Sequence, residues 1–456
     1  MKPSKQDEVV FAWIHLSDIH VGHGDVTHGW DQKLVLEAIR ADIVDAISTR
    51  KVPQPCAVFV TGDIAFSGAT RSKDEYDSAR TWLLSIGSGA GLRQEDIFVL
   101  PGNHDVQRSV DKDDKNTGRL IRALRAGEES IDAVLSDPTD RAHLEKRQAN
   151  YLAFAKDFAP ANRIDHESPA SPFFWRHQFR IGADLEVRIA GLNTALLSAD
   201  DTDHGKLRLG LSQLGHVLLN PPIGERTIVM LLSHHPFRAG WLGDQADVDS
   251  WAKSHAHIHL SGHVHEADAE QAISGAGGSF IRVVAGASHG DRSPPSVPAS
   301  HGYNFAALLR APNGSIRLAV WPRRWSDKHK RFRSDVDNVP DGETCSVHEI
   351  KGVKISPVTP APAPRKALIS ILVEMSMTSS FEGRTSLLQG IPAGIGLTRS
   401  EGNRLLDLQH IVNGLRDRKL SDGRPCLAVV IDNALSFAAG TDLADALLLE
   451  RNAIGA

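Results

Sequence analysis

The feature that most constrains the fold of this chain is a set of five apolar runs. Each run ends in polar side chains that are able to bind metal. The runs cover residues 9–20, 56–64, 96–105, 227–236 and 257–265. Near-continuous Val, Ile and Leu predict strands buried on both faces. Segments of helical periodicity at residues 31–48 and 72–87 separate the first three runs, and this alternation predicts a layered α/β fold. Ligands gather beyond the carboxyl ends of strands in such sheets, so we expect the five polar endings to converge.

A chain of 456 residues predicts one large domain and a smaller one. The large domain is expected over residues 1–340, with a charged helical insertion at 106–161 beside the site. Further strands would build a second sheet packed on the first. They are expected at residues 173–181, 185–197, 279–288, 303–311 and 315–325.

The last quarter of the chain differs in character. Residues 341–365 are expected to form a Pro-rich linker, because proline and small residues favour an extended, semi-rigid spacer. Residues 366–456 carry apolar positions at helical spacing and predict a small all-α domain.

Composition indicates a cytoplasmic protein without a membrane partner. The net charge of -5 gives no overall attraction to nucleic acid or to anionic membranes. The apolar stretch near residue 10 is too short and too interrupted to predict a signal peptide, and no run approaches the roughly 18 apolar residues of a membrane span. Cys56, Cys345 and Cys426 are odd in number and lack metal-ligand spacing, which favours a reducing compartment.

One basic stretch, residues 321–335, interleaves arginine and lysine with tryptophan. Such a stretch could contact a phosphate backbone and stack bases. We favour the alternative, a solvated strand end and connector, so nucleic acid is a possible but not a favoured partner.

The candidate metal ligands occur as an ordered set of short motifs at strand ends: DxH, GDxxxxG, GNHD, HHP and GHxH. They are Asp18, His20, Asp63, Asn103, His234, His263 and His265. Each motif alone is weak, but the ordered set is not a chance coincidence. Carboxylate, amide oxygen and imidazole ligands suit Mn, Fe, Zn or Mg ions. His257 and His259 are interpreted as hydrogen-bonded strand residues outside the site.

Over roughly the first 330 residues this ordered set resembles the calcineurin-like metallophosphoesterase superfamily. The resemblance implies a four-layer α/β/β/α sandwich with two metal ions at the strand ends. The implied ligands of one ion are Asp18, His20, Asp63 and His265. The implied ligands of the other are Asp63, Asn103, His234 and His263, so that Asp63 bridges the pair.

The resemblance also implies a mechanism, in which a hydroxide bridging the ions attacks phosphorus in line. His104 is the implied proton donor to the leaving group. Asp105 either orients the His104 ring and favours its protonated form, or caps the following turn. The segment GDIAFSG is nearer the phosphodiesterase branch than the DNA-repair nucleases, so a phosphodiester, for example a nucleotide, is the expected substrate. No substrate-binding residue is assigned.

Residues 366–456 resemble the helical effector-associated adaptor domains of bacterial conflict and signalling proteins, which implies a protein partner. The alternative is a stabilising or dimerising extension. The sequence therefore predicts a dinuclear-metal-dependent phosphoesterase tethered to a helical adaptor domain. Two alternatives stay open: a metal-dependent DNA nuclease in a bacterial conflict system, and a non-catalytic, metal-stabilised binding module.

Overall fold

The computed structural model divides into two compact units, Met1–Pro357 and Val358–Ala456. The residues that it describes are 7–23, 26–69, 73–158, 172–182, 185–200, 202–219, 223–264, 268–273, 279–289, 301–354 and 364–454.

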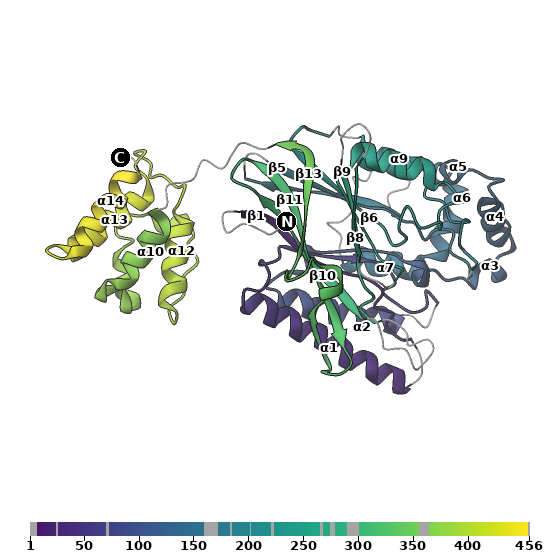
Figure 1. Cartoon of the computed structure of the whole chain (residues 1–456), viewed down its shortest axis with the longest axis horizontal. Helices are drawn as coiled ribbons and strands as arrows, with labels where there is room; N and C mark the ends of the chain where they lie inside the picture. The colour runs from purple at the N-terminus through teal and green to yellow at the C-terminus, as the bar shows by residue number, and fades with distance from the viewer. Residues whose placement is uncertain are drawn as a thin grey trace. The chain divides into compact units, whose positions relative to one another are not determined.

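The first unit contains two sheets (Figure 1). The seven-stranded sheet has the order β12-β11-β10-β1-β2-β3, and β13 pairs with β11. Its strands are β1 (Glu8–Leu16), β2 (Ala57–Thr61), β3 (Ile97–Leu100), β10 (Gly302–Arg310), β11 (Ser315–Ser326), β12 (Arg331–Ser334) and β13 (Ser346–Lys354). The six-stranded sheet has the order β4-β5-β6-β7-β9-β8. Its strands are β4 (Trp175–Ile181), β5 (Leu185–Gly191), β6 (Thr227–Leu232), β7 (Ile258–Ser261), β8 (Asp268–Ile273) and β9 (Ser279–Val284).

The helices of the first unit cover these sheets and form the expected insertion between β3 and β4. They are α1 (Val26–Ser48), α2 (Lys73–Gly89), α3 (Val110–Asp113), α4 (Lys115–Ala126), α5 (Ile131–Ser136), α6 (Pro138–Arg147), α7 (Ala149–Phe158), α8 (Leu211–Leu218) and α9 (Gln245–His255). Short 3-10 helices cover Gln94–Asp96, Asn103–Asp105 and Val336–Asn338. The end of the expected insertion, residues 159–161, lies outside the described residues.

The alternation of side chains along β1 generates the layers. Ile14 and Leu16 pack in one core with residues of α1 and α2. Phe11 and Trp13 point to the opposite face, where they pack in a second core with residues of β5 and β6. That second core also takes in apolar side chains of α8 and α9. The order helix, sheet, sheet, helix confirms the four-layer fold expected from the sequence.

The division of strands between the sheets differs from the sequence prediction. The five apolar runs do not share one sheet, because β6 and β7 pair with β5 and β9. Conversely, β10 and β11 join the first sheet, where β10 pairs antiparallel with β1. Buried strands are apolar in either sheet, so hydrophobic pattern identifies a strand without identifying its neighbour.

The sequence prediction also starts the linker too early in the chain. β13, which lies inside residues 341–365, pairs antiparallel with β11 and extends the first sheet. Edge pairing satisfies the backbone groups of a segment that lacks a long apolar run. Residues 355–363, which include most of the Pro-rich stretch, lie outside the described residues.

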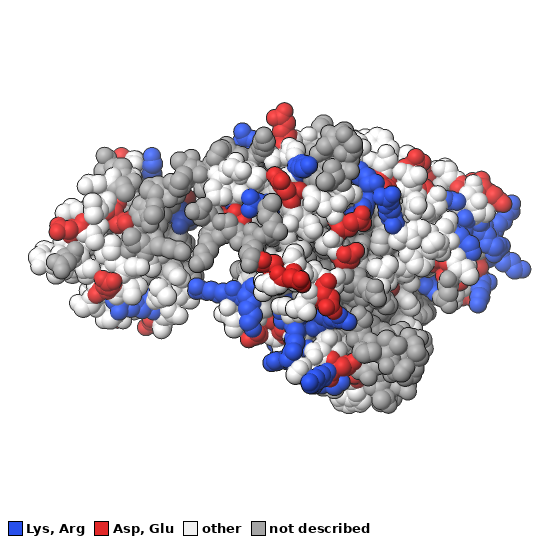
Figure 2. All heavy atoms as spheres, in the orientation of Figure 1, with Lys and Arg blue, Asp and Glu red and all other residues white. Residues whose placement is uncertain are grey.

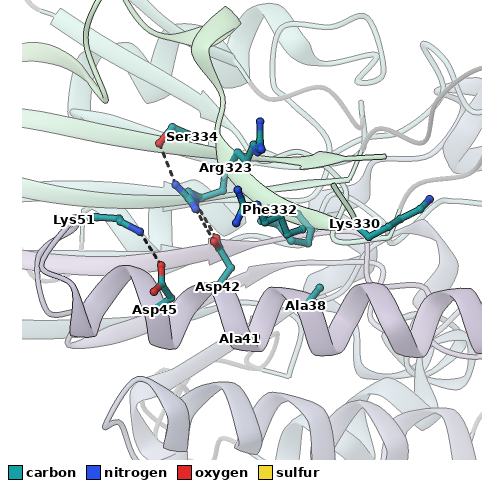
Figure 3. Close-up of a pocket in the computed structure, with 11 residues that line it drawn as sticks. Ala38, Ala41, Asp42, Asp45, Lys51, Arg323, Lys330, Phe332 and Ser334 are labelled. Atoms are coloured by element: carbon teal, nitrogen blue, oxygen red, sulfur yellow. Dashed lines mark hydrogen bonds and ion pairs between the residues drawn. The ribbon is translucent and has the colours of Figure 1, made fainter. Parts of the chain in front are cut away.

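The basic stretch forms the β11–β12 hairpin and its turn. Arg323 is buried and paired with Asp42 of α1, with its Nη2 2.5 Å and its Nε 2.8 Å from the two carboxylate oxygens (Figure 3). Arg324 forms an ion pair with Asp337, with Nη1 2.6 Å from Oδ2. A cavity of about 590 Å³ lies between α1 and this hairpin. These contacts agree with the strand-end-and-connector interpretation.

Charged side chains of the first unit are interspersed by sign on the face shown in Figure 2. The three cysteines are free thiols. In the described part of the chain, no helix has both the length and the apolar character needed to cross a membrane.

Every described element of the second unit is helical. The elements are α10 (Pro364–Glu374), α11 (Phe381–Ser386), α12 (Arg404–Gly414), α13 (Cys426–Ala438), α14 (Asp442–Ala453) and the 3-10 helices Ser376–Ser379 and Ala393–Ile395.

A buried ion pair joins α11 to α12 inside this unit. Arg384 is 1% and Asp407 is 0% exposed, and Arg384 Nε lies 2.7 Å from Asp407 Oδ2. Arg399 also pairs with Asp407, through its Nε at 2.9 Å from Oδ1. Burial would raise the pKa of Asp407, but the hydrogen bonds from Arg399, Ser400 and Arg384 lower it to about 2.

We predict that the second unit loses stability as the pH falls from about 4, the pKa of an unfolded Asp, toward 2. The carboxylate stabilises the folded state only while it is charged. Asp407→Asn should abolish this pH dependence and destabilise the unit by about 3–5 kcal/mol at neutral pH. The measurement is hydrogen exchange of residues 364–454 in the full chain.

The matched control is Asp432→Asn, which breaks the exposed pair of Asp432 with Arg451. It should cost about 1 kcal/mol or less. Equal destabilisation by the two variants would contradict the prediction.

Candidate metal centre

The predicted ligands converge from both sheets of the first unit. Asp18 and His20 follow β1, and Asp63 follows β2. His234 follows β6 and His263 follows β7. Asn103 begins the 3-10 helix after β3. His265 lies outside the described residues. The strand ends of the two sheets therefore meet, as expected for the polar endings.

Asp63 lies at the centre of this group and is 1% exposed. Its Oδ2 lies 3.1 Å from His20 Nε2 and 3.2 Å from His234 Nε2. Its Oδ1 accepts a hydrogen bond from the backbone N–H of His104 at 2.7 Å. One carboxylate thus contacts imidazoles that come from different sheets.

The remaining described ligands surround the same spot. His234 Nε2 lies 2.9 Å from Asn103 Oδ1 and 3.2 Å from His263 Nδ1. A carboxylate oxygen of Asp18, one of Asp63 and a ring nitrogen of His234 lie within 4.8 Å of one another. Six of the seven predicted ligands therefore form one constellation.

The backbone is left-handed at four of these ligands. Asp18, His20, Asp63 and His263 have φ values of 53°, 52°, 53° and 69°. Among the described residues, only Arg50 and Lys330 are further non-glycine positions with positive φ. Such conformations are strained and cluster at functional sites. The strain turns each side chain sharply off its strand and into the space between the strand ends.

Gly62 permits the close approach of the loops that follow β2 and β3. Its φ is +98°, and a Cβ there would lie 2.7 Å from Gly102 N and 2.7 Å from His234 Nδ1. Gly62 O accepts a hydrogen bond from Asp18 N at 3.0 Å, which ties the β1 loop to the same point.

Backbone carbonyls hold the outer nitrogens of two imidazoles. His234 Nδ1 lies 2.8 Å from Thr61 O, and His20 Nδ1 lies 3.4 Å from His289 O. A carbonyl accepts only, so Nδ1 carries the proton in both rings. Nε2 of each ring faces Asp63, and it can bind a cation once it carries no proton, which is the usual arrangement of metal-binding histidine.

The donor set fits metal ions. Burial lowers the pKa of His20 and of His234, but the contact with Asp63 outweighs it and raises each pKa to about 9. Without a metal, the buried charge of Asp63 is therefore balanced by protons on the two rings. Divalent ions can replace those protons, because carboxylate, amide oxygen and neutral imidazole converge with their lone pairs inward.

Asp105 is buried and is hydrogen-bonded to backbone groups of two loops. Its carboxylate accepts backbone hydrogen bonds from Gly102, Ile64 and Ala65 at 2.9, 3.1 and 3.1 Å. It also accepts one from Tyr76 Oη at 2.9 Å. Asp105 thus fixes the loops that carry the ligands.

The His104 ring is oriented by a different group. His104 Nδ1 donates to Phe66 O at 2.8 Å, and its ring packs edge-on against His20 with centroids 4.8 Å apart. Burial lowers the pKa of His104 and outweighs the attraction of Asp63, so the surroundings do not favour the protonated form as expected.

His257 and His259 lie outside the centre, as predicted. His257 Nδ1 accepts a hydrogen bond from Val229 N at 3.0 Å. His259 Nε2 lies 2.8 Å from Ser233 Oγ, and its ring stacks on Phe237 with centroids 3.8 Å apart.

Sequence reasoning missed the residues that hold the ligands. Thr61, Phe66 and His289 act through backbone carbonyls, which leave no trace in residue type. Gln32 of α1 donates through Nε2 to His20 O at 2.8 Å. His235 was also missed, although it adjoins a predicted ligand; its ring centroid lies 4.4 Å from that of His263.

The family profile described as calcineurin-like phosphoesterase matches residues 13–267, more than half of the chain. The chain belongs to the calcineurin-like phosphoesterase family. The two-sheet fold and the clustered His and Asp side chains agree with that membership.

The uncharacterized metallophosphoesterase-like protein YydB of Bacillus subtilis (strain 168) is 20% identical over 245 residues. The match covers 50% of this chain and 45% of YydB, so the chain spans about half the length of this curated relative.

Two solved structures share a weaker likeness. The NAD nucleotidase of Haemophilus influenzae has a TM-score of 0.37 at 11% identity, over 71% of this chain and 53% of that one. The calcineurin-like phosphoesterase YfkN of Bacillus subtilis has a TM-score of 0.30 at 10% identity, over 76% and 93%.

We predict that Gly62→Ala impairs both folding and metal retention. The left-handed φ costs alanine about 1–2 kcal/mol, and the clash with Gly102 and His234 adds to that cost. Thermal unfolding and metal content measure the two effects.

Gly91→Ala is the matched control. Gly91 has a φ of +72°, but a Cβ there meets its nearest atom, Gln54 Nε2, only at 3.7 Å. Gly91→Ala should lower stability modestly and leave metal content unchanged. Similar behaviour of the two variants would show that the close approach at Gly62 is unimportant.

Proposed function

We propose that the first unit is a dinuclear-metal-dependent phosphoesterase that prefers phosphodiesters. The observation that carries the proposal is the convergence of six ligand-type side chains around buried Asp63, four of them on left-handed backbone. The ligand roles follow the motif order, with Asp18, His20 and Asp63 at one ion. Asp63, Asn103, His234 and His263 serve the other, and His265 is proposed from sequence alone.

Two metal ions held by these residues would supply an activated water and charge stabilisation for phosphoryl oxygens. The chain's own groups hold the ligands in place. Thr61 and His289 fix the ring orientations of His234 and His20, and Asp105 holds the backbone of the two loops that follow β2 and β3. Positioning of this kind supplies much of the rate in phosphoryl transfer.

His104 is the proposed proton donor to the leaving oxygen. Its Nδ1 is engaged by Phe66 O, so Nε2 is the atom that would exchange a proton with the substrate. Because burial lowers the pKa of His104, the doubly protonated ring is a minor form near neutral pH in the free protein. Its contribution should therefore be largest for esters whose leaving group is poor.

The proposed preference for diesters rests on the GDIAFSG segment. On the same ground we propose a nucleotide as the substrate. We further propose a cytoplasmic location, on the three free cysteines. The helical unit is proposed as an adaptor that brings the phosphoesterase to a protein partner by raising its effective concentration.

The proposal predicts hydrolysis by the Mn-loaded full chain in a screen of four substrate classes. These are bis-p-nitrophenyl phosphate, p-nitrophenyl phosphate, cyclic nucleotides and DNA. The diester should be cleaved faster than the monoester. Activity on DNA alone would favour the nuclease alternative, and background rates throughout would favour the binding module.

Asp63→Asn should reduce hydrolysis to background and lower the metal content, because the carboxylate contacts groups assigned to both ions. Metal analysis and turnover are measured on the same preparation. Asp45→Asn, which alters an exposed carboxylate of α1, is the control and should match the unaltered chain. Full metal content in Asp63→Asn would remove Asp63 from the bridging position.

His104→Ala should retain metal and lose about 10²–10⁴-fold in rate on an alkyl phosphodiester. The loss should be much smaller on a p-nitrophenyl ester, whose leaving group needs little protonation. The comparison of kcat for the two esters is the measurement. Equal losses on both would assign His104 a role other than proton donation.

A further inference from the structure

A second group of metal-ligand side chains lies beside the candidate centre. A carboxylate oxygen of Asp31 and ring nitrogens of His289 and His301 lie within 4.8 Å of one another. None of the three belongs to the motif set. His289 and His301 are each 1% exposed, whereas the Asp31 side chain is 46% exposed. The group thus has a buried imidazole floor and an opening to solvent.

The distances within the group are close to those of a binding site. Asp31 Oδ2 lies 3.6 Å from His289 Nε2. The two imidazole centroids lie 5.0 Å apart, with their planes inclined by 15°. A turn of either ring about χ2, a torsion with broad preferences, changes the direction of its lone pair without moving the backbone.

Backbone hydrogen bonds fix both histidines. His289 N donates to Asp18 O at 3.1 Å, which anchors it to the loop after β1. His301 forms an isolated bridge with Ala287, and its carbonyl accepts from Trp325 N at 2.8 Å. The two rings are therefore presented from a backbone that is already tied down.

Asp31 is held in register by its neighbour on α1. Gln32 donates through Nε2 to Ile19 O at 3.0 Å and to His20 O at 2.8 Å. The helix and His289 are thus both tied to the loop that follows β1. Little backbone rearrangement would be needed to bring the three donors onto one ion.

The chemistry of the donors points to a transition-metal ion. Two imidazoles and one carboxylate suit Zn, Mn or Fe, and three protein ligands leave positions for water. The solvent-facing Asp31 provides the path by which an ion would exchange.

We propose that Asp31, His289 and His301 form a third divalent-metal site, distinct from the two ions proposed at the catalytic centre. The site positions the centre through His289, whose carbonyl contacts His20 Nδ1 at 3.4 Å while its imidazole faces Asp31. A metal ion bound there would also link α1 to His289 and His301. The site goes beyond phosphoester hydrolysis and does not depend on it.

The test is the zinc stoichiometry of the full chain after removal of metals with a chelator and reloading with Zn²⁺. The unaltered chain should retain three equivalents and Asp31→Asn two. Asp45→Asn is the matched control, since Asp45 is a comparably exposed carboxylate (56%) of the same helix, and it should retain three. His301→Gln should also lose one equivalent, and Asp31→Asn keeps the test valid if the buried variant fails to fold.

Anomalous scattering from zinc-loaded crystals locates each ion. A peak between Asp31, His289 and His301 is expected. Equal zinc content in Asp31→Asn and Asp45→Asn, with no peak at the three residues, would overturn the proposal and leave the group as an ion pair between α1 and the loop.

Failure of the catalytic proposal would look different. Asp63→Asn should lose the two ions of the catalytic centre and keep the third. A chain that retains one equivalent, lost in Asp31→Asn but kept in Asp63→Asn, would support the third site and contradict the dinuclear centre.

Discussion

The burial of the Asp63 carboxylate is the constraint on which the first unit depends. A charge removed from water needs compensation, and here it comes from a backbone N–H and two imidazoles. His20 follows a strand of one sheet and His234 follows a strand of the other. The two sheets must therefore pack with their strand ends aligned. The apolar cores hold the layers together, and the contacts of Asp63 link the two sheets at the site.

Left-handed backbone at the strand ends gives this arrangement its precision. At Asp18, His20, Asp63 and His263 the chain leaves its strand abruptly, so a side chain that would otherwise alternate along a sheet points across the strand ends. The strained turns are held by hydrogen bonds between loops, including those that Asp105 accepts from Ile64 and Ala65. Strain of this kind persists only where the surroundings over-determine it.

Hydrogen bonds also link the centre to α1 and α2, which cover the first sheet. Gln32 ties α1 to the His20 loop, and Tyr76 of α2 donates to Asp105. Asp42, farther along α1, anchors Arg323 of β11. The helices that cover the first sheet thus also position the ligands, so substitutions on their buried faces can reach the centre. The second unit has its own buried anchor, Arg384 with Asp407, and its own core.

The sequence by itself determined the ligand types, their order and their place after buried strands, because apolar runs and short polar motifs are local signals. It also led to the four-layer fold, through the family resemblance that those motifs carry. Tertiary structure alone decided which strands are neighbours, since β6 and β10 are both buried along almost their whole length although they lie in different sheets. It alone decided which carbonyl holds each ring: Thr61 and His234 are 173 residues apart, and any residue type offers a carbonyl. The role of Asp105 and the grouping of Asp31 with His289 and His301 likewise depend on distances between segments that no local pattern records.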